Sequence, residues 1–448
     1  MVLVAVTAAA PVTQLVPPMT VTYVPQSTRF VCWLTGGREV ATRASAGLVG
    51  ADLGYSFQAG RQVWWLFGDS LPTLRFAGKP NAESRWPFDQ NANGNDSVAI
   101  SDLTAPGICP VLRFVKELRP VPGAYADPWV TPDPGYAAGS SQVSLRTNET
   151  PVAGLVVRGH LYATFSTDNP VDACQVARKP NCTPRKYLGH STRAVMGELV
   201  DARTLEFRGL YNLSAPTTRY GSGAKLVSNA MALGAGGYVY IWGVEGDLDY
   251  GKSAPYLARI PAATISTGRG LEFFDGVSFS GRPVFAAGER NAVALFHDDP
   301  DCMSHLGVQY NPFVREWIML YNCGGKGVEM RSAQQPWGTW SKPQLIFSLA
   351  PNRTARTGYC YFMHEVSGTD CPPGAPNPPA DSSVQGAAYA PYFVAGWTTG
   401  TYARTGFPAS STFYYTISTF SPYAEVILRS TIRGPIVRRL PCRGIKCA

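Results

Sequence analysis

Aromatic and β-branched residues gather in five short segments, each of which follows a turn and ends in a small or polar residue. The five segments are residues 63–69, 161–168, 238–245, 317–322 and 413–419. Aligned on Phe67, Phe165, Trp242, Tyr321 and Ile417, they recur at intervals of 77–98 residues. Such runs are typical of β-strands, and one similar strand per blade is typical of a β-propeller. The pattern predicts an all-β, five-bladed β-propeller whose strands are joined by long loops.

The rest of the chain fits one domain with decorated loops. Long stretches with helical periodicity are absent, and glycine (45), proline (37) and tyrosine (22) are abundant. We expect the propeller to span residues 21–448, with residues 11–45 extended before the first blade. Residues 1–20 are a candidate signal or lead-in segment, because Val2–Ala10 is largely apolar and ends in three alanines. A signal peptide usually begins with basic residues, which are missing here, so an arbitrary start is the alternative. No apolar stretch is long enough to predict a membrane span.

Cysteines and glycosylation sequons favour secretion. The ten cysteines include no C-x-x-C motif, so disulfides are favoured over a zinc site. Neighbours in the sequence suggest the pairs Cys174–Cys182, Cys302–Cys323, Cys360–Cys371 and Cys442–Cys447, which leaves Cys32 and Cys109, although spacing alone leaves the connectivity open. Five N-x-S/T sequons are present, at Asn95, Asn148, Asn181, Asn212 and Asn352. We expect a secreted, disulfide-containing glycoprotein.

The net charge of +8 arises from scattered lysines and arginines, without a basic run. A nucleic-acid-binding protein usually carries a basic stripe, so no nucleic-acid partner is expected. The positive charge is compatible with an acidic polysaccharide partner or with solubility alone.

Two aspartates flank the first predicted hairpin. A two-residue turn at Ala59–Gly60 would pair Gln58 with Arg61 and place Asp52 and Asp69 near one another on one face. A one-residue bulge would place them on opposite faces instead. In a propeller, the start of the inner strand and the end of the second strand reach the same rim, so both carboxylates would face the axial funnel.

Two neighbouring carboxylates suit glycoside hydrolysis, in which one donates a proton and the other attacks or activates water. The alternative is that Asp69 caps a turn and Asp52 is a solvated loop residue. Four further polar residues fall at equivalent rim positions and are candidates for substrate binding, or else have turn or core roles: Asn229, His305, Asp168 and Glu245. Tyr55, next to the rim, is a candidate platform for a sugar ring.

Several segments, in order along nearly the whole chain, resemble one known family. They are Asp52-Leu53-Gly54 with 65–70, 238–243 with 255–260, 307–313 with 317–321, and 413–419 with Pro422-Tyr423. The chain resembles the five-bladed propeller family, long of unknown function, that includes endo-D-arabinanases acting on mycobacterial-type arabinan. The resemblance implies that Asp52 and Asp69 are the catalytic pair. The additional cysteines, the long loop after Ser70 and the sequons depart from the family pattern.

The leading hypothesis is a secreted, monomeric glycoside hydrolase that is endo-acting on an arabinan-type furanose polysaccharide. A lectin-like propeller without activity, or a structural propeller that presents its loops to a protein partner, are the alternatives. No cofactor is expected. The acidic segments around Asp96 and at 245–249 resemble loose calcium-binding loops without the EF-hand spacing, which leaves a structural calcium ion open.

Overall fold

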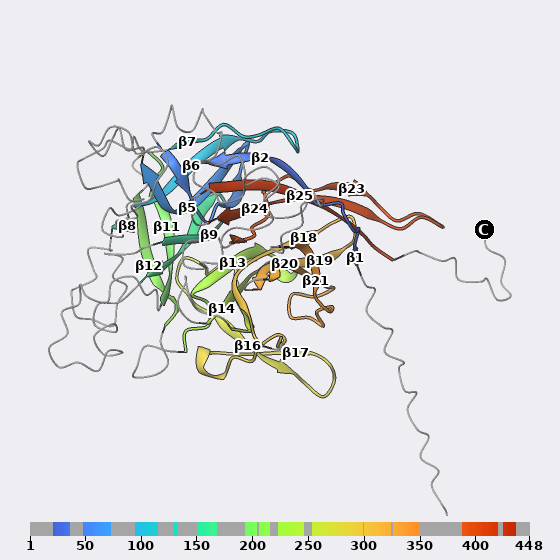
Figure 1. Ribbon diagram of the computed structural model, residues 1–448. Helices are drawn as coiled ribbons and strands as arrows, with labels where there is room; N and C mark the ends of the chain where they lie inside the picture. The colour runs from blue at the N-terminus through green and yellow to red at the C-terminus, as the bar shows by residue number, and fades with distance from the viewer. Residues whose placement is uncertain are drawn as a thin grey trace, which may run out of the picture.

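The structure is a five-bladed, all-β propeller (Figure 1), which confirms the predicted fold. In this computed structural model the described residues are 21–35, 48–72, 95–114, 130–131, 150–167, 193–203, 206–215, 223–245, 253–298, 300–323, 326–348, 388–419 and 424–435. Each of the five aromatic segments forms the second strand of its own sheet, as the recurring pattern predicted. Among the described residues, no helix has the length and apolarity that a membrane crossing requires.

The first three blades follow one another along the chain. Blade 1 contains β3 (Leu48–Ala51), β4 (Tyr55–Ala59), β5 (Gln62–Pro72), β6 (Asn95–Asp102) and β7 (Arg113–Phe114). Blade 2 contains β9 (Thr150–Val157), β10 (His160–Thr167), β11 (Arg193–Asp201) and β12 (Glu206–Ser214), with β8 (Val130–Thr131) at its edge. Blade 3 contains β13 (Ser228–Leu233), β14 (Tyr238–Val244), β15 (Pro255–Pro261), β16 (Glu272–Val277) and β17 (Pro283–Ala286). Two short 3-10 helices, η2 (Ala235–Gly237) and η3 (Glu289–Asn291), adjoin this blade.

The last two blades close the ring. Blade 4 contains β18 (Met303–Asn311), β19 (Glu316–Cys323), β20 (Gly327–Ala333) and β21 (Gln344–Ser348). Blade 5 contains β22 (Ala388–Tyr389), β23 (Thr399–Thr401), β24 (Ser410–Thr419) and β25 (Ala424–Arg433), together with β1 (Thr22–Tyr23) and β2 (Arg29–Thr35) from the N-terminal end. The segment expected to be a lead-in therefore contains two strands of blade 5. Pairing the two ends of the propeller in one sheet closes the ring through backbone hydrogen bonds.

Large aromatic side chains fill the space between the blades. Trp65, Trp242 and Trp397 are each no more than 1% exposed. Each indole N–H still has an acceptor: Ser101 Oγ at 3.0 Å, Pro336 O at 2.9 Å and Thr104 O at 3.1 Å, respectively. The buried rings supply apolar contact area, and the satisfied N–H groups avoid the cost of an unpaired buried donor.

Two disulfides join described residues, and both agree with the cysteine grouping of the sequence. Cys302–Cys323 links the residue before β18 to the end of β19 in blade 4, and Cys32–Cys109 links β2 of blade 5 to the connection after β6 of blade 1. The second bond adds a covalent link to the hydrogen-bonded closure of the ring. The other six cysteines lie outside the described residues.

The register of the first hairpin differs from the prediction. Ala59 pairs with Gln62, so the two-residue loop is Gly60–Arg61, one residue later than expected. Gly60 has φ +64°, which glycine adopts without steric cost. Both loops have two residues and retain the apolar alternation, so the sequence pattern does not distinguish them.

Candidate functional site

One rim of the propeller gathers polar residues from four blades. The inner strands of the propeller, β4, β9, β13, β18 and β22, surround its axis. Asp52 precedes β4, Asn229 and His305 lie near the starts of β13 and β18, and Tyr389 lies in β22. Because these strands all begin on the same rim, residues distant in the sequence meet there.

The Asp52 carboxylate is buried at this rim, with the residue 8% exposed. Its Oδ2 accepts a hydrogen bond of 2.7 Å from the hydroxyl of Tyr389 in blade 5. Its Oδ1 lies against the α-carbon of Gly68, where a Cβ atom would collide with it. The bare backbone of Gly68 therefore makes room for the carboxylate beside β5.

The backbone brings Asp69 close to Asp52. Ala51 pairs with Ser70, and the Asp52 carbonyl accepts a hydrogen bond of 3.0 Å from the Gly68 N–H. Asp69 therefore lies across from the turn that carries Asp52. The side chain of Asp69 is outside the described part of the chain, so the predicted distance between the two carboxylates stays a prediction.

Asp52 projects from a tight turn between β3 and β4. The Gly54 N–H donates to the Asp52 carbonyl at 3.0 Å, and the intervening Leu53 has φ +70°. A three-residue turn of this kind with a positive φ at its centre is rare and strained. Strain of this kind persists only where the surrounding structure holds it in place.

Blade 5 supplies a second carboxyl group beneath this turn. Glu425 is fully buried, and burial raises its pKa from 4.5 to about 8. Its Oε2 accepts a hydrogen bond of 2.6 Å from Ser418 Oγ. Ser418 Oγ in turn accepts a hydrogen bond of 2.8 Å from the Leu53 N–H. The sequence analysis missed Glu425 and Tyr389. The sequence did contain one signal for Glu425: it is a charged residue near the start of the apolar run 424–428, where a buried side chain is expected.

His305 lies beside Tyr389, with the two ring centroids 5.7 Å apart. It is 3% exposed, and burial lowers its pKa to about 4, so the ring is neutral near pH 7. Its Nδ1 lies 3.3 Å from Ser304 Oγ, whereas its buried Nε2 has no hydrogen-bond partner among the described residues. His305 thus remains a candidate contact for a substrate hydroxyl.

Asn229 and Tyr55 have structural partners in the propeller. The Asn229 side chain accepts from Thr164 Oγ1 at 2.8 Å and donates to the Leu226 carbonyl at 3.0 Å. Tyr55 is buried, and its hydroxyl donates a hydrogen bond of 3.2 Å to the Met231 carbonyl. Its ring packs edge-on against Tyr392. Burial raises the pKa of Tyr55 to about 12. This placement makes Tyr55 part of the packing along the axis.

The predicted rim residue Glu245 forms an ion pair within blade 3. Glu245 follows β14 and its Oε2 is 2.6 Å from Lys225 Nζ, which also lies 4.4 Å from the centroid of the Tyr256 ring. Asp168 and residues 246–249 of the predicted acidic loop are outside the described residues. Asp96 lies in β6, paired with β5.

A cavity of about 340 Å³ occupies the axis on the other side of Tyr55. All five blades line it: blades 1 to 4 through later residues of their inner strands, among them Gln58, Val156, Leu233 and Gln309, and blade 5 through residues after β22, among them Gly396. The residues of blades 1 to 4 are at the ends of the strands opposite to the rim of Asp52. This cavity is therefore distinct from the group of polar residues around Asp52.

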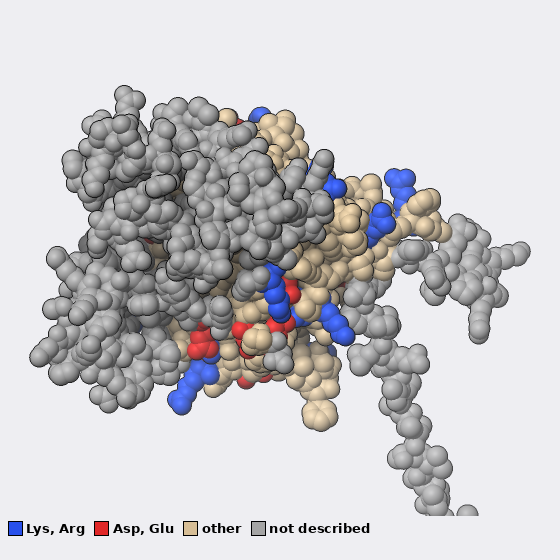
Figure 2. Space-filling view, in the orientation of Figure 1, with Lys and Arg blue, Asp and Glu red and all other residues tan. Residues whose placement is uncertain are grey.

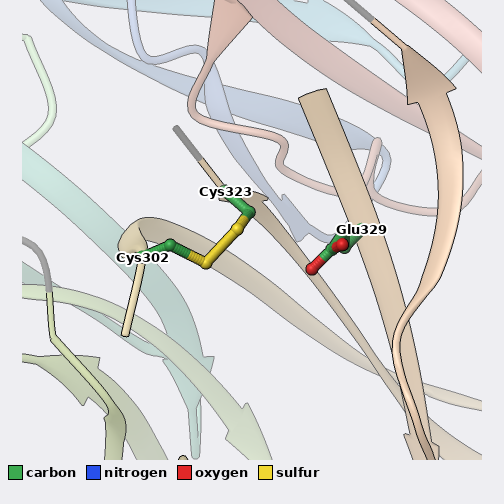
Figure 3. A group of neighbouring side chains, drawn as sticks. All are labelled: Cys302, Cys323 and Glu329. Atoms are coloured by element: carbon green, nitrogen blue, oxygen red, sulfur yellow. A yellow bond between two sulfur atoms is a disulfide. The ribbon is translucent and has the colours of Figure 1, made fainter. Parts of the chain in front are cut away.

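One cluster in the described part of the chain has the residue types of a metal site. The sulfurs of Cys302 and Cys323 and the Glu329 carboxylate lie within 4.8 Å of one another (Figure 3). The two sulfurs are joined as a disulfide and are not thiolates, which are the form of cysteine that binds metal ions. The cluster in this form is not a metal centre.

Charges on the described surface are mixed. Figure 2 shows basic side chains singly or beside acidic ones over the lower part of this face. Several are ion pairs, such as Arg259 with Glu272 at 2.9 Å and Arg208 with Glu198 at 2.8 Å. This interspersed pattern differs from the basic stripe of a nucleic-acid-binding surface.

Comparison with known proteins gives one family match and several distant structures. A protein-family profile described as a domain of unknown function, DUF4185, matches residues 204–429, half of the chain. Asp52 precedes the matched region, whereas His305, Tyr389, Ser418 and Glu425 lie within it. No curated protein matches the chain.

Solved structures with the same general fold share little sequence with it. A candidate hydrolase from Bacteroides ovatus ATCC 8483 has 11% identity and a TM-score of 0.49 over 87% of both chains. The catalytic domain of a Coprinopsis cinerea GH62 α-L-arabinofuranosidase has 8% identity and a TM-score of 0.40, covering 92% of this chain and 98% of that one. An exo-β-1,3-galactanase from Phanerochaete chrysosporium has 9% identity and a TM-score of 0.41, covering 90% and 64%. Because each TM-score is below 0.5, the function of this chain has to be argued from its own residues.

Proposed function

The chain belongs to the DUF4185 family, and we propose that it is a glycoside hydrolase whose reaction takes place at the rim that carries Asp52. The observation that carries this proposal is a buried carboxylate held by Tyr389 at 2.7 Å, on a strained turn, with the backbone of a second aspartate across from it. Buried carboxyl groups on strained backbone are common at functional sites. Paired carboxyl groups are the usual machinery of glycoside hydrolysis.

The two aspartates have different roles in this proposal. The Tyr389 hydroxyl donates to Asp52 Oδ2, which suits an ionised carboxylate, an acceptor that can attack the sugar or activate a water molecule. Asp69 then serves as the general acid that protonates the leaving oxygen. The neutral ring of His305 is buried beside Tyr389, so a substrate hydroxyl would reach its Nε2 only if the surrounding side chains move.

We further propose an arabinan-type furanose polysaccharide as the substrate, cleaved internally. The basis for this choice is the resemblance of the first hairpin, Asp52-Leu53-Gly54 with 65–70, and of the other matching segments to endo-D-arabinanases. Residues 73–94, 168–192 and 349–387 lie outside the described residues. Because loops determine which polymers reach a rim of this kind, substrate choice has to be measured.

We also propose that the protein works outside the cytosol, because the Cys32–Cys109 and Cys302–Cys323 disulfides are typical of an oxidising compartment. Of the five sequons, Asn212 lies inside β12 with its Oδ1 buried. Since glycans attach at exposed positions, we expect any glycosylation at the other sequons.

The test is product release from a panel of arabinans and other furanose polymers by wild type, Asp52→Asn and Asp69→Asn. We expect oligosaccharides from the wild type and a loss of at least about a hundredfold in kcat in both variants, as for removal of an acid or base. Turnover that survives both substitutions would reject the aspartate pair. Saturable binding without turnover on any polymer would instead support a lectin-like propeller.

A further inference from the structure

We propose that Ser418 and Glu425 are positioning residues that hold the turn beneath Asp52 and thereby aim its carboxylate. The two residues come from β24 and β25 of blade 5, whereas Asp52 belongs to blade 1. The effect of Ser418 and Glu425 on catalysis rests on the proposed glycoside hydrolase function. Their effect on the position of the Asp52 carboxylate does not depend on that function.

The turn needs support because its backbone is strained. Leu53 has φ +70° and Gly54 has φ +54°, both in the left-handed region. For an L-residue such as leucine this conformation is unfavourable, because the Cβ atom approaches the backbone too closely. Without a compensating contact the turn would relax, and the direction of the Asp52 side chain would change with it.

Ser418 provides the contact that holds the turn. Its hydroxyl oxygen accepts a hydrogen bond of 2.8 Å from the Leu53 N–H. Its hydroxyl group donates a hydrogen bond of 2.6 Å to Glu425 Oε2. A hydroxyl has one hydrogen to donate. The Glu425 carboxyl fixes where that hydrogen goes and leaves a lone pair directed at the Leu53 N–H.

Glu425 also contacts the turn directly. A Cβ atom built on Gly54 would lie 2.5 Å from Glu425 Oε1, so this oxygen packs against the bare glycine backbone. Thr416 Oγ1 lies 3.4 Å from the Gly54 carbonyl oxygen and 3.3 Å from the Tyr392 carbonyl oxygen, and these two acceptors share its one hydrogen. Blade 5 therefore contacts the turn at its N–H, its α-carbon and its carbonyl.

Glu425 acts through its neighbours rather than on a substrate. It is 0% exposed, and its carboxyl packs against the backbone of Gly54 in the turn. Asp52 itself is held at its other end by Tyr389, also of blade 5. One blade thus fixes both the backbone and the carboxylate of Asp52.

Crystal structures of variants test the geometry without reference to activity. In Ser418→Ala and Glu425→Ala we expect the Tyr389 hydroxyl and Asp52 Oδ2 to separate beyond hydrogen-bond distance, about 3.5 Å. Glu425→Gln keeps an acceptor for Ser418 and should preserve the bond. Glu316→Ala is the matched control, since Glu316 is also a buried carboxyl but lies at the opposite end of blade 4. An unchanged bond in Ser418→Ala, the mildest variant, would overturn the inference even if Glu425→Ala fails to fold.

Kinetics on the polymer cleaved by the wild type test the catalytic consequence. We expect Ser418→Ala to lower kcat by about 10- to 100-fold, the scale for a small misplacement of a reacting group, with KM within about twofold. Glu425→Gln should stay within about threefold of the wild type, and so should Glu316→Ala. Wild-type turnover with an undiminished kcat in Ser418→Ala would overturn the positioning role. A wild type without turnover would reject the proposed function, and the crystal structures would then decide the geometric claim.

Discussion

Replacing the buried Glu425 with glutamine should change how the stability of the protein depends on pH. Burial raises the pKa of Glu425 from 4.5 to about 8 in the folded protein. Between these values the folded protein keeps a proton that the unfolded chain releases. The free energy of unfolding therefore falls as the pH rises through this window and levels off above about pH 8. Glutamine cannot ionise and should remove this contribution.

The magnitude follows from the two pKa values. Each pKa unit is worth about 1.4 kcal/mol, so the difference in unfolding free energy between Glu425→Gln and wild type should grow by about 1.4 kcal/mol per pH unit. Summed from pH 4.5 to 8, the change is on the order of 5 kcal/mol. Tyr55, Glu425 and Asp52 each interact electrostatically with Tyr392, and Tyr55, Asp52 and Tyr392 are present in both proteins. Their contributions largely cancel in the difference.

Urea unfolding followed by tryptophan fluorescence, with the disulfides kept oxidised, gives the two free energies from pH 5 to 9. Buried Trp65, Trp242 and Trp397 report on the packing between blades. Equal m-values in the two proteins would show that the same surface is exposed on unfolding. A difference that stays constant within about 0.5 kcal/mol over this range would refute the argument, because it would mean that the buried carboxyl titrates alike in both states.

Three further substitutions follow from the backbone and the disulfides. Gly68→Ala places a methyl group on Asp52 Oδ1, so kcat on the cleaved polymer should fall at least about a hundredfold, and retained activity would contradict the placement of the carboxylate. The Cys32–Cys109 disulfide joins residues 77 positions apart. Replacing both cysteines with alanine should lower the free energy of unfolding by about 4 kcal/mol. An unchanged urea midpoint would argue against a stabilising role of this disulfide. Arg158 lies in the exposed turn between β9 and β10 and has φ +52°. Arg158→Asn should raise the midpoint of thermal unfolding, because asparagine adopts a positive φ at a lower cost than arginine. A lower midpoint would contradict the view that the positive φ of Arg158 is strained.

The sequence by itself determined the all-β fold and the number of blades. A strand that is buried between two neighbours needs aromatic and β-branched residues, and this need recurs once per blade, so Phe67, Trp242 and Ile417 mark equivalent strands. Closeness in the chain suggested the pairing of Cys302 with Cys323, and the structure contains this disulfide. These features depend on local patterns, which the order of residues displays directly.

The tertiary structure decided the register, the closure of the ring and the environment of Asp52. Tyr389 is 337 positions from Asp52 in the sequence, and Ser418 is 365 positions from Leu53, yet each pair is hydrogen-bonded. Such contacts exist only because the ring places blade 5 beside blade 1. The same closure buries Glu425 and raises its pKa, since desolvation depends on everything packed around the carboxyl and not on its neighbours along the chain.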